Sequence, residues 1–334
     1  MRLENTLALI NGELINSPFV NNFTNIIFEA KAVRRGDLFI AFDETTIEEA
    51  IFNGAYGVIF DKPTQITDSE IAWIKVKDLE DALKRLLRFE LINKETTVYE
   101  CDEIILKLAL QVVTEPNFVV LHGDIKAIFK MLSNIESGSI ILFSPALTSK
   151  DIFTNTKKLP KAPANSINIV EQTLFETSFI YDNTFYERQL ISPFFMPYLE
   201  KLLYLFKSLK INFRLRKFTP IEHFEAVFTN KNFEIKEFGT SDKVLIFEKS
   251  SALISNEISF LQSQACWAKI IHLIPLSYKS SIDSDSQNIF IYRYEDEIKS
   301  ILKANSFHFA LLVGVDKSIL DKPLVKQTQL TLDF

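Results

Sequence analysis

Short apolar runs alternate with amphipathic segments along most of this 334-residue chain, and this alternation constrains the fold more than any other feature. Apolar runs joined by segments with three- and four-residue apolar spacing predict parallel strands connected by helices, an α/β fold. Strands are expected at residues 37–42, 57–60, 71–76, 117–123, 139–143, 244–248, 269–274, 288–292 and 308–313. Helices are expected at 46–53, 78–89, 100–115, 125–135, 197–209, 256–265 and 295–304. An edge hairpin at 179–190 and a loop at 148–166 complete the expected elements.

Glycine is scarce and phenylalanine abundant, with 8 Gly against 30 Phe. Proteins that wrap nucleotides use glycine where the backbone approaches phosphate closely, so this balance argues against nucleotide handling. The net charge of -6 provides no broad positive field for a polyphosphate backbone. The composition therefore predicts no direct nucleic-acid binding.

Only two cysteines are present, Cys101 and Cys266, and they are far apart. They form neither a disulfide framework nor a zinc motif, and we expect both to be buried thiols. Residues 1–11 lack the pattern of an export signal, and apolar stretches such as 139–143 and 309–315 are too short to cross a membrane. A cytoplasmic protein with no membrane span is the prediction.

The four histidines are scattered along the sequence. His272 and His308 fall inside predicted strands, where we expect structural roles. His122 follows a strand but has no Ser, Cys or Asp arranged with it, as nucleophilic catalysis would require. The sequence therefore predicts neither a metal site nor catalytic residues.

Residues 33–42 read Val-Arg-Arg-Gly-Asp-Leu-Phe-Ile-Ala-Phe and are followed by Ala50–Gly57 and an apolar strand. This stretch resembles the N-terminal domain of the Mur ligases of peptidoglycan synthesis, most of all the branch that adds D-alanyl-D-alanine to the UDP-linked muramoyl tripeptide. In that family the domain cradles the UDP end of the precursor. The resemblance implies a UDP-muramoyl precursor as a candidate partner, with candidate binding residues Lys31, Arg34, Gly36, Asp37 and Phe39.

The match weakens at the substrate side, because the family's Asp-Ser-Arg corresponds to Glu29, Ala30 and Lys31. The hydroxyl of the family motif is therefore absent, and only the basic position is kept, with Lys31 in place of arginine. The loop that follows the strand is also shortened, to residues 43–46, and reaches less far around a ligand.

The family's phosphate-binding loop corresponds to residues 118–127, Phe-Val-Val-Leu-His-Gly-Asp-Ile-Lys-Ala. Gly123 and Lys126 remain but stand one residue too close together. Ile125 replaces the second glycine, and Ala127 replaces the hydroxyl that would bind magnesium. We expect this degenerate loop to bind no triphosphate and the protein to have no cofactor.

The other ATP-site motifs of the family are also missing, so the resemblance implies a reduced central α/β domain. Residues 218–224 resemble the family's lead-in to its C-terminal domain, with Phe224 nearest the position of its arginine. Residues 247–252 stand at the acceptor-binding motif and share only its acidic position. The expected division is an N-terminal Mur-ligase-like domain, the reduced central domain, a doubly wound C-terminal domain and a tail, at residues 1–95, 96–215, 216–320 and 321–334.

The C-terminus reads Gln-Leu-Thr-Leu-Asp-Phe, which resembles the hexapeptide by which bacterial polymerases and repair proteins dock onto the replication sliding clamp. An end segment with a glutamine anchor and apolar residues suits insertion into a preformed groove. The resemblance implies partner-binding roles for Gln329, Leu330, Leu332 and Phe334, with a merely packed or frayed tail as the alternative.

The sequence as a whole predicts a non-catalytic Mur-ligase-like pseudoenzyme linked to peptidoglycan synthesis or cell division, which binds a cell-wall precursor or a protein partner. One alternative is a replication or repair accessory protein that uses the C-terminal tail to bind the sliding clamp. A weaker alternative is a ligase with a rebuilt active site.

Overall fold

The computed structural model describes residues 1–92, 94–163, 166–215, 217–237, 240–281 and 288–320. Its contacts divide the chain into two compact units. The first unit comprises Met1–Leu106 and Val113–Pro160, and the second comprises Lys107–Val112 and the chain from Lys161 onward. Each unit is described by itself.

The first unit begins with a five-stranded sheet in the order β1-β5-β4-β3-β2, in which only β1 runs antiparallel to its neighbour. Its strands are β1 (Glu13–Leu14), β2 (Ile26–Ile27), β3 (Leu38–Ile40), β4 (Gly57–Phe60) and β5 (Ala72–Lys75). Its helices are α1 (Leu3–Ile10), α2 (Ile47–Phe52) and α3 (Leu79–Ile92), with two short 3-10 turns, η1 (Ala30–Ala32) and η2 (Glu44–Thr46). Alternate side chains of the strands enter two separate cores, one shared with α3 and one with α2.

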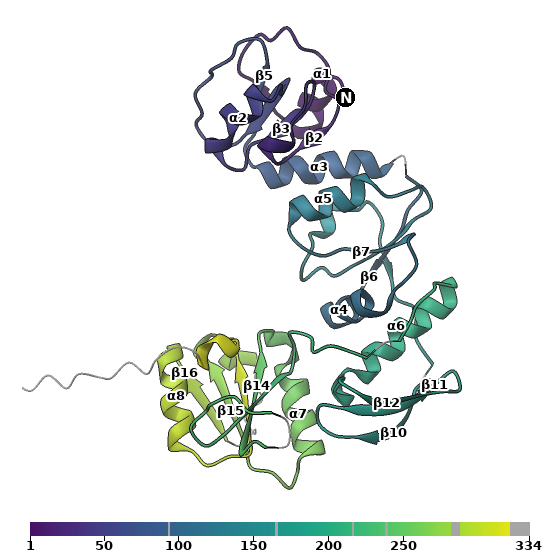
Figure 1. The fold of residues 1–334 in the computed structure, drawn as a ribbon, viewed down its shortest axis with the longest axis vertical. Helices are drawn as coiled ribbons and strands as arrows, with labels where there is room; N and C mark the ends of the chain where they lie inside the picture. The colour runs from purple at the N-terminus through teal and green to yellow at the C-terminus, as the bar shows by residue number, and fades with distance from the viewer. Residues whose placement is uncertain (93, 164–165, 216, 238–239, 282–287, 321–334) are drawn as a thin grey trace, which may run out of the picture. The chain divides into compact units, whose positions relative to one another are not determined.

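A second, fully parallel sheet of the first unit has the order β7-β8-β6-β9. Its elements are β6 (Thr97–Glu100), α4 (Glu103–Val112), β7 (Phe118–Val120), α5 (Ile125–Ser133), β8 (Ile140–Phe143), η3 (Lys150–Ile152) and β9 (Lys157–Lys158). The part of α4 from Lys107 onward belongs to the second unit. Helix α5 packs against α3, and the two lie side by side in Figure 1. Leu83 and Leu87 of α3 and Phe129 and Leu132 of α5 belong to one buried cluster, which joins the two sheets of this unit.

The second unit contains a three-stranded antiparallel sheet, β10-β11-β12, and a five-stranded sheet in the order β13-β14-β17-β15-β16. In the larger sheet only β13 is antiparallel. Helix α8 shares a buried core with one face of that sheet, and α7 lies on the other side (Figure 1). The elements are β10 (Asn168–Gln172), β11 (Thr177–Tyr181), β12 (Thr184–Gln189), η4 (Pro193–Phe195), α6 (Met196–Leu209), β13 (Glu225–Thr229), β14 (Lys243–Glu248), η5 (Ser251–Leu253), α7 (Ile254–Gln264), β15 (Ile270–Pro275), η6 (Leu276–Ser281), β16 (Ile289–Tyr292), α8 (Glu295–Ala304), β17 (Phe309–Val313) and η7 (Lys317–Leu320).

The predicted α/β class and most predicted elements are confirmed, including a helix at 295–304 and the hairpin, whose two-residue turn has positive φ at Asp182 and Asn183. The prediction of a loop throughout 148–166 is wrong, because β9 forms there and pairs with β6. The helix predicted from residue 100 begins at Glu103, after strand β6. Helix α1 and strands β1, β2, β6, β10 and β13 were not predicted.

Each of the four sheets falls inside one of the predicted domains. The first sheet, at 13–75, lies in the N-terminal domain, the sheets at 97–158 and 168–189 lie in the central domain, and the sheet at 225–313 lies in the C-terminal domain. The compact units, however, divide after Leu106 and Pro160. The boundaries at 95, 215 and 320 therefore stay a prediction. The predicted tail, 321–334, lies outside the described residues.

Candidate functional site

The degenerate phosphate loop connects β7 to α5 in the first unit. Gly123 adopts φ +88°, a left-handed conformation that glycine accepts without strain. Asp124 then caps the helix, and its carboxylate accepts the backbone N–H of Ala127 at 2.9 Å. The positive end of the helix thus already holds a negative charge from the chain itself.

Lys126 extends from the first turn of α5 toward an aromatic ring. Its ammonium lies 4.3 Å from the centroid of the Phe42 ring, close enough for a cation–π interaction. This position orients the only lysine of the loop toward the end of the first sheet. The predicted loop residues Gly123 and Lys126 therefore adopt a helix-capping turn and an aromatic contact.

A cavity of about 370 Å³ adjoins the loop and is lined by Phe42, Gly123, Asp124 and Lys126, among others. Thr148 lines the same cavity, and its buried hydroxyl has no hydrogen-bond partner among the described residues. The lining also carries one more acid and one more base, Glu80 and Lys84. Because acidic and basic groups balance, the cavity is not a concentrated anion site.

The candidate precursor-binding residues lie around β3, also in the first unit. Asp37 is buried, and its carboxylate accepts hydrogen bonds from Asn25 N at 3.2 Å, Asn25 Nδ2 at 2.9 Å and Arg34 N at 2.9 Å. Gly36 adopts φ +99°, and a Cβ at this position would stand 2.7 Å from Thr24 Oγ1. Gly36 and Asp37 thus stabilise the turn that leads into β3.

Phe39 is 1% exposed and belongs to the core beneath α2, so its ring does not reach a ligand at the surface in this structure. Lys31 and Arg34 are exposed. Of the five candidate precursor-binding residues, these two basic side chains are the ones a precursor could contact.

The two segments of the second unit that were compared with family motifs lie together at a buried carboxylate. Glu248, at the end of β14, accepts a hydrogen bond from Phe224 N at 3.1 Å and one from Ser250 N at 2.6 Å. His223 Nδ1 lies 2.9 Å from Glu248 Oε1. Glu257 on α7 is also fully buried and interacts with Glu248.

The pKa values of these two carboxyl groups are shifted in opposite directions. Burial alone raises the pKa of Glu248, but the contact with His223 and the hydrogen bond from Ser250 N outweigh it and lower this pKa. Burial, followed by the negative charge of Glu248, raises the pKa of Glu257 well above its ordinary value. The neutral form of Glu257 is therefore favoured beside the carboxylate of Glu248. From the sequence, Glu248 was only an acidic position shared with a family motif, and Glu257 was missed; its place in the helix predicted at 256–265 was the available signal.

The other histidines have structural surroundings. His272 is buried in β15, and burial lowers its pKa to about 4. His308 was predicted inside a strand, but it is exposed and directly precedes β17, where its Nδ1 accepts the N–H of Lys269 at 2.9 Å. His122 Nδ1 lies 2.9 Å from the carbonyl oxygen of Val120.

The prediction of two buried thiols holds for Cys101 but is wrong for Cys266. Cys266 lies in the turn between α7 and β15, beside the exposed Trp267, where no core covers it. Among the described residues, no cluster of His, Cys, Asp or Glu could hold a metal ion. No helix in the described part of the chain is both long and apolar enough to cross a membrane.

No family model matches the chain, and no curated protein matches it in sequence. Solved structures do match. MurF from Acinetobacter baumannii is 9% identical, with 93% of this chain and 95% of that chain covered and a TM-score of 0.52. MurF ligase from Thermotoga maritima in complex with ADP is 12% identical, with 89% and 95% covered and a TM-score of 0.47. The similarity to the first of these shows that the chain has a Mur-ligase-like fold.

Proposed function

Given this fold, we propose that the chain is a non-catalytic cytoplasmic protein of peptidoglycan synthesis or cell division, which acts by binding a precursor or a protein partner. The observation that carries the proposal is the Asp124 cap on α5. A triphosphate placed at this helix terminus would bring its charge against the Asp124 carboxylate and would compete for the Ala127 N–H.

Two further features of the loop support the same proposal. Lys126 lies over Phe42, so phosphate binding would require it to leave that ring. Ala127 supplies no hydroxyl for magnesium. Positioning and charge stabilisation of the phosphates are most of what a protein contributes to phosphoryl transfer, and in this loop the lysine lies over Phe42 while the magnesium-binding hydroxyl is absent.

Calorimetric titration of the full chain with Mg-ATP tests the loss of nucleotide binding. We expect no heat of binding up to millimolar nucleotide, both for the wild type and for Lys126→Ala. Micromolar affinity that Lys126→Ala abolishes would overturn the proposal. A direct assay of precursor ligation covers the alternative of a rebuilt active site, since any ATP-dependent ligation would establish an enzyme.

Binding of the precursor is proposed to depend on Lys31 and Arg34, the exposed candidates. Titration with the UDP-linked muramoyl tripeptide should give an affinity that Lys31→Ala and Arg34→Ala weaken, while Lys62→Ala, a matched exposed lysine of the same unit, leaves it unchanged. If the precursor fails to bind the wild type, the proposal reduces to binding of a protein partner.

The alternative of a clamp-binding accessory protein rests on Gln329, Leu330, Leu332 and Phe334. Surface-immobilised sliding clamp should capture the full chain and release it when residues 329–334 are deleted. Absence of capture by the full chain would remove this alternative. Capture that survives the deletion would assign the contact to another part of the chain.

A further inference from the structure

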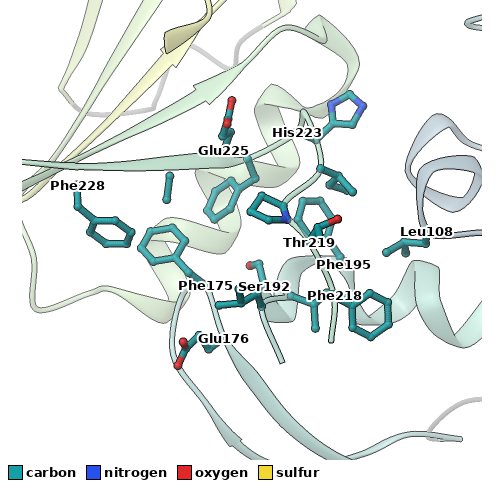
Figure 2. Close-up of a pocket in the computed structure, with 16 residues that line it drawn as sticks. Leu108, Phe175, Glu176, Ser192, Phe195, Phe218, Thr219, His223, Glu225 and Phe228 are labelled. Atoms are coloured by element: carbon teal, nitrogen blue, oxygen red, sulfur yellow. The ribbon is translucent and has the colours of Figure 1, made fainter. Parts of the chain in front are cut away.

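A second cavity, of about 160 Å³, lies within the second unit and is mainly apolar (Figure 2). Its walls come from the segment after β12, from residues 218–224, from β13, from the turn before β11 and from Leu108 of α4. Five of the lining residues are phenylalanines: Phe175, Phe195, Phe218, Phe224 and Phe228. The cavity is partly open, so its apolar walls face water unless an apolar ligand covers them.

The aromatic side chains of the walls already contact one another. The rings of Phe175 and Phe228 are 5.6 Å apart and edge-to-face at 90°, and those of Phe175 and Phe224 are 5.9 Å apart and tilted at 36°. A further aromatic ring in the cavity would extend this set at the same spacing, the arrangement that aromatic quadrupoles favour.

The wall at Phe224 is built on a strained backbone. Phe224 adopts φ +46°, which is unfavourable for a bulky side chain. The buried carboxylate of Glu248 accepts its N–H and contacts the neighbouring His223 side chain, and so stabilises this turn. Strain of this kind persists where the surroundings enforce it, and it is concentrated at ligand sites.

We propose that this cavity binds one uncharged aromatic ring of about benzene size. An enclosed apolar cavity of about 150 Å³ lined by aliphatic and aromatic side chains takes up benzene, and this partly open cavity has a similar volume. The ring belongs to a small aromatic compound or to an aromatic side chain of a peptide. The site is separate from the phosphate loop and from the candidate precursor-binding residues, because every lining residue belongs to the second unit.

Toluene is the first probe, titrated into the full chain and followed by saturation-transfer NMR. Ala226 in β13 lines the cavity, and Ala226→Leu places a larger side chain in it. We expect this variant to weaken toluene binding at least about tenfold, while Ala304→Leu, at the exposed end of α8, leaves binding unchanged. No binding of toluene to the wild type, or equal binding to the folded Ala226→Leu variant, would overturn the proposal.

A second variant keeps the proposal testable if Ala226→Leu does not fold. Phe228→Ala enlarges the cavity and should shift its preference from toluene toward the larger ring of indole. Adenosine should bind at least about tenfold more weakly than toluene, because its ring nitrogens would lose water without gaining enough partners. An unchanged preference in Phe228→Ala, or adenosine binding as tightly as toluene, would refute an apolar ring site.

N-acetyl-phenylalaninamide distinguishes the two sources of the ring. If this probe binds more tightly than toluene and competes with it, the site accepts a peptide side chain. Tighter binding of toluene assigns the site to a small aromatic compound. Failure of both probes contradicts the proposal.

Discussion

The ammonium of Lys126, in the first turn of the helix that Asp124 caps, lies 4.3 Å from the centre of the Phe42 ring. The two contacts are complementary, because the acid accepts the Ala127 N–H in the first helical turn while the base is held by an aromatic face. A loop that resembles a phosphate site in sequence is thereby stabilised by interactions within the chain.

Removal of the helix cap should destabilise the first unit. Asp124→Ala loses the bond to Ala127 N and should lower the free energy of unfolding by about 1 kcal/mol, whereas Asp124→Asn retains an accepting oxygen and should cost little. The chain has two tryptophans, Trp73 in the first unit and Trp267 in the second. In a Trp267→Phe background, urea titrations followed by Trp73 fluorescence report on the first unit alone. Equal stability of the Ala and Asn variants would contradict a capping role.

Loss of the buried carboxylate of Asp37 should lower the free energy of unfolding more than loss of the Asp124 cap does. Asp37→Ala leaves two backbone N–H groups and the Asn25 side chain without their acceptor and should lower the free energy of unfolding by about 3 kcal/mol. Asp37→Asn keeps one accepting oxygen and should cost less. The same Trp73 measurement checks both. A near-neutral Ala variant would show that water replaces these bonds.

Two glycines of the first unit both have a left-handed backbone but differ in the space around them, so they separate backbone strain from steric contact. Gly54 has φ +101°, and its Cβ would approach Arg35 backbone atoms at 3.1 Å, whereas Gly138 has φ +85° with nothing within 4 Å. Gly138→Ala should cost about 1 kcal/mol from its left-handed backbone alone. Gly54→Ala should cost clearly more, since the backbone cannot yield as a side chain can. Urea midpoints that do not separate the two variants would exclude a steric contribution at Gly54.

Acid should destabilise the second unit through His272. Its pKa falls from 6.5 in the unfolded chain to about 4 in the folded one, so below pH 6.5 the unfolded state binds the extra proton. Stability is therefore lost as the pH falls from 6.5 toward 4, by about 3 kcal/mol for this group. Glu248 and Glu257 also titrate in this unit, but they are common to every variant compared.

Hydrogen exchange of the β15 peptide, measured from pH 4 to pH 7, checks this expectation. His272→Leu should remove the histidine's share of the loss, while Leu273→Val, a neighbouring buried change, should lower stability equally at every pH. The same pH slope in the wild type and in His272→Leu would disprove the assignment.

Local periodicity was enough to predict most helices and long strands, because a buried face repeats its apolar residues at the period of the element. The helix at 295–304 was predicted at its observed bounds for this reason. Strand β10 was missed because all five of its residues are exposed and carry no alternation. Strand β9 has only two residues, and its pairing with β6 spans more than fifty positions of the chain.

Sequence alone determined the α/β class, the likeness of residues 33–60 to the Mur ligases and the missing glycine and hydroxyl of the loop, since each is set by residue type and local spacing. The tertiary structure decided that Phe39 is core and that His223, Glu248 and Glu257 meet. It also decided that five phenylalanines enclose a cavity. Those features depend on contacts between segments that are distant in the sequence. The burial of a side chain and its hydrogen-bond partners are decided only when folding brings those segments together.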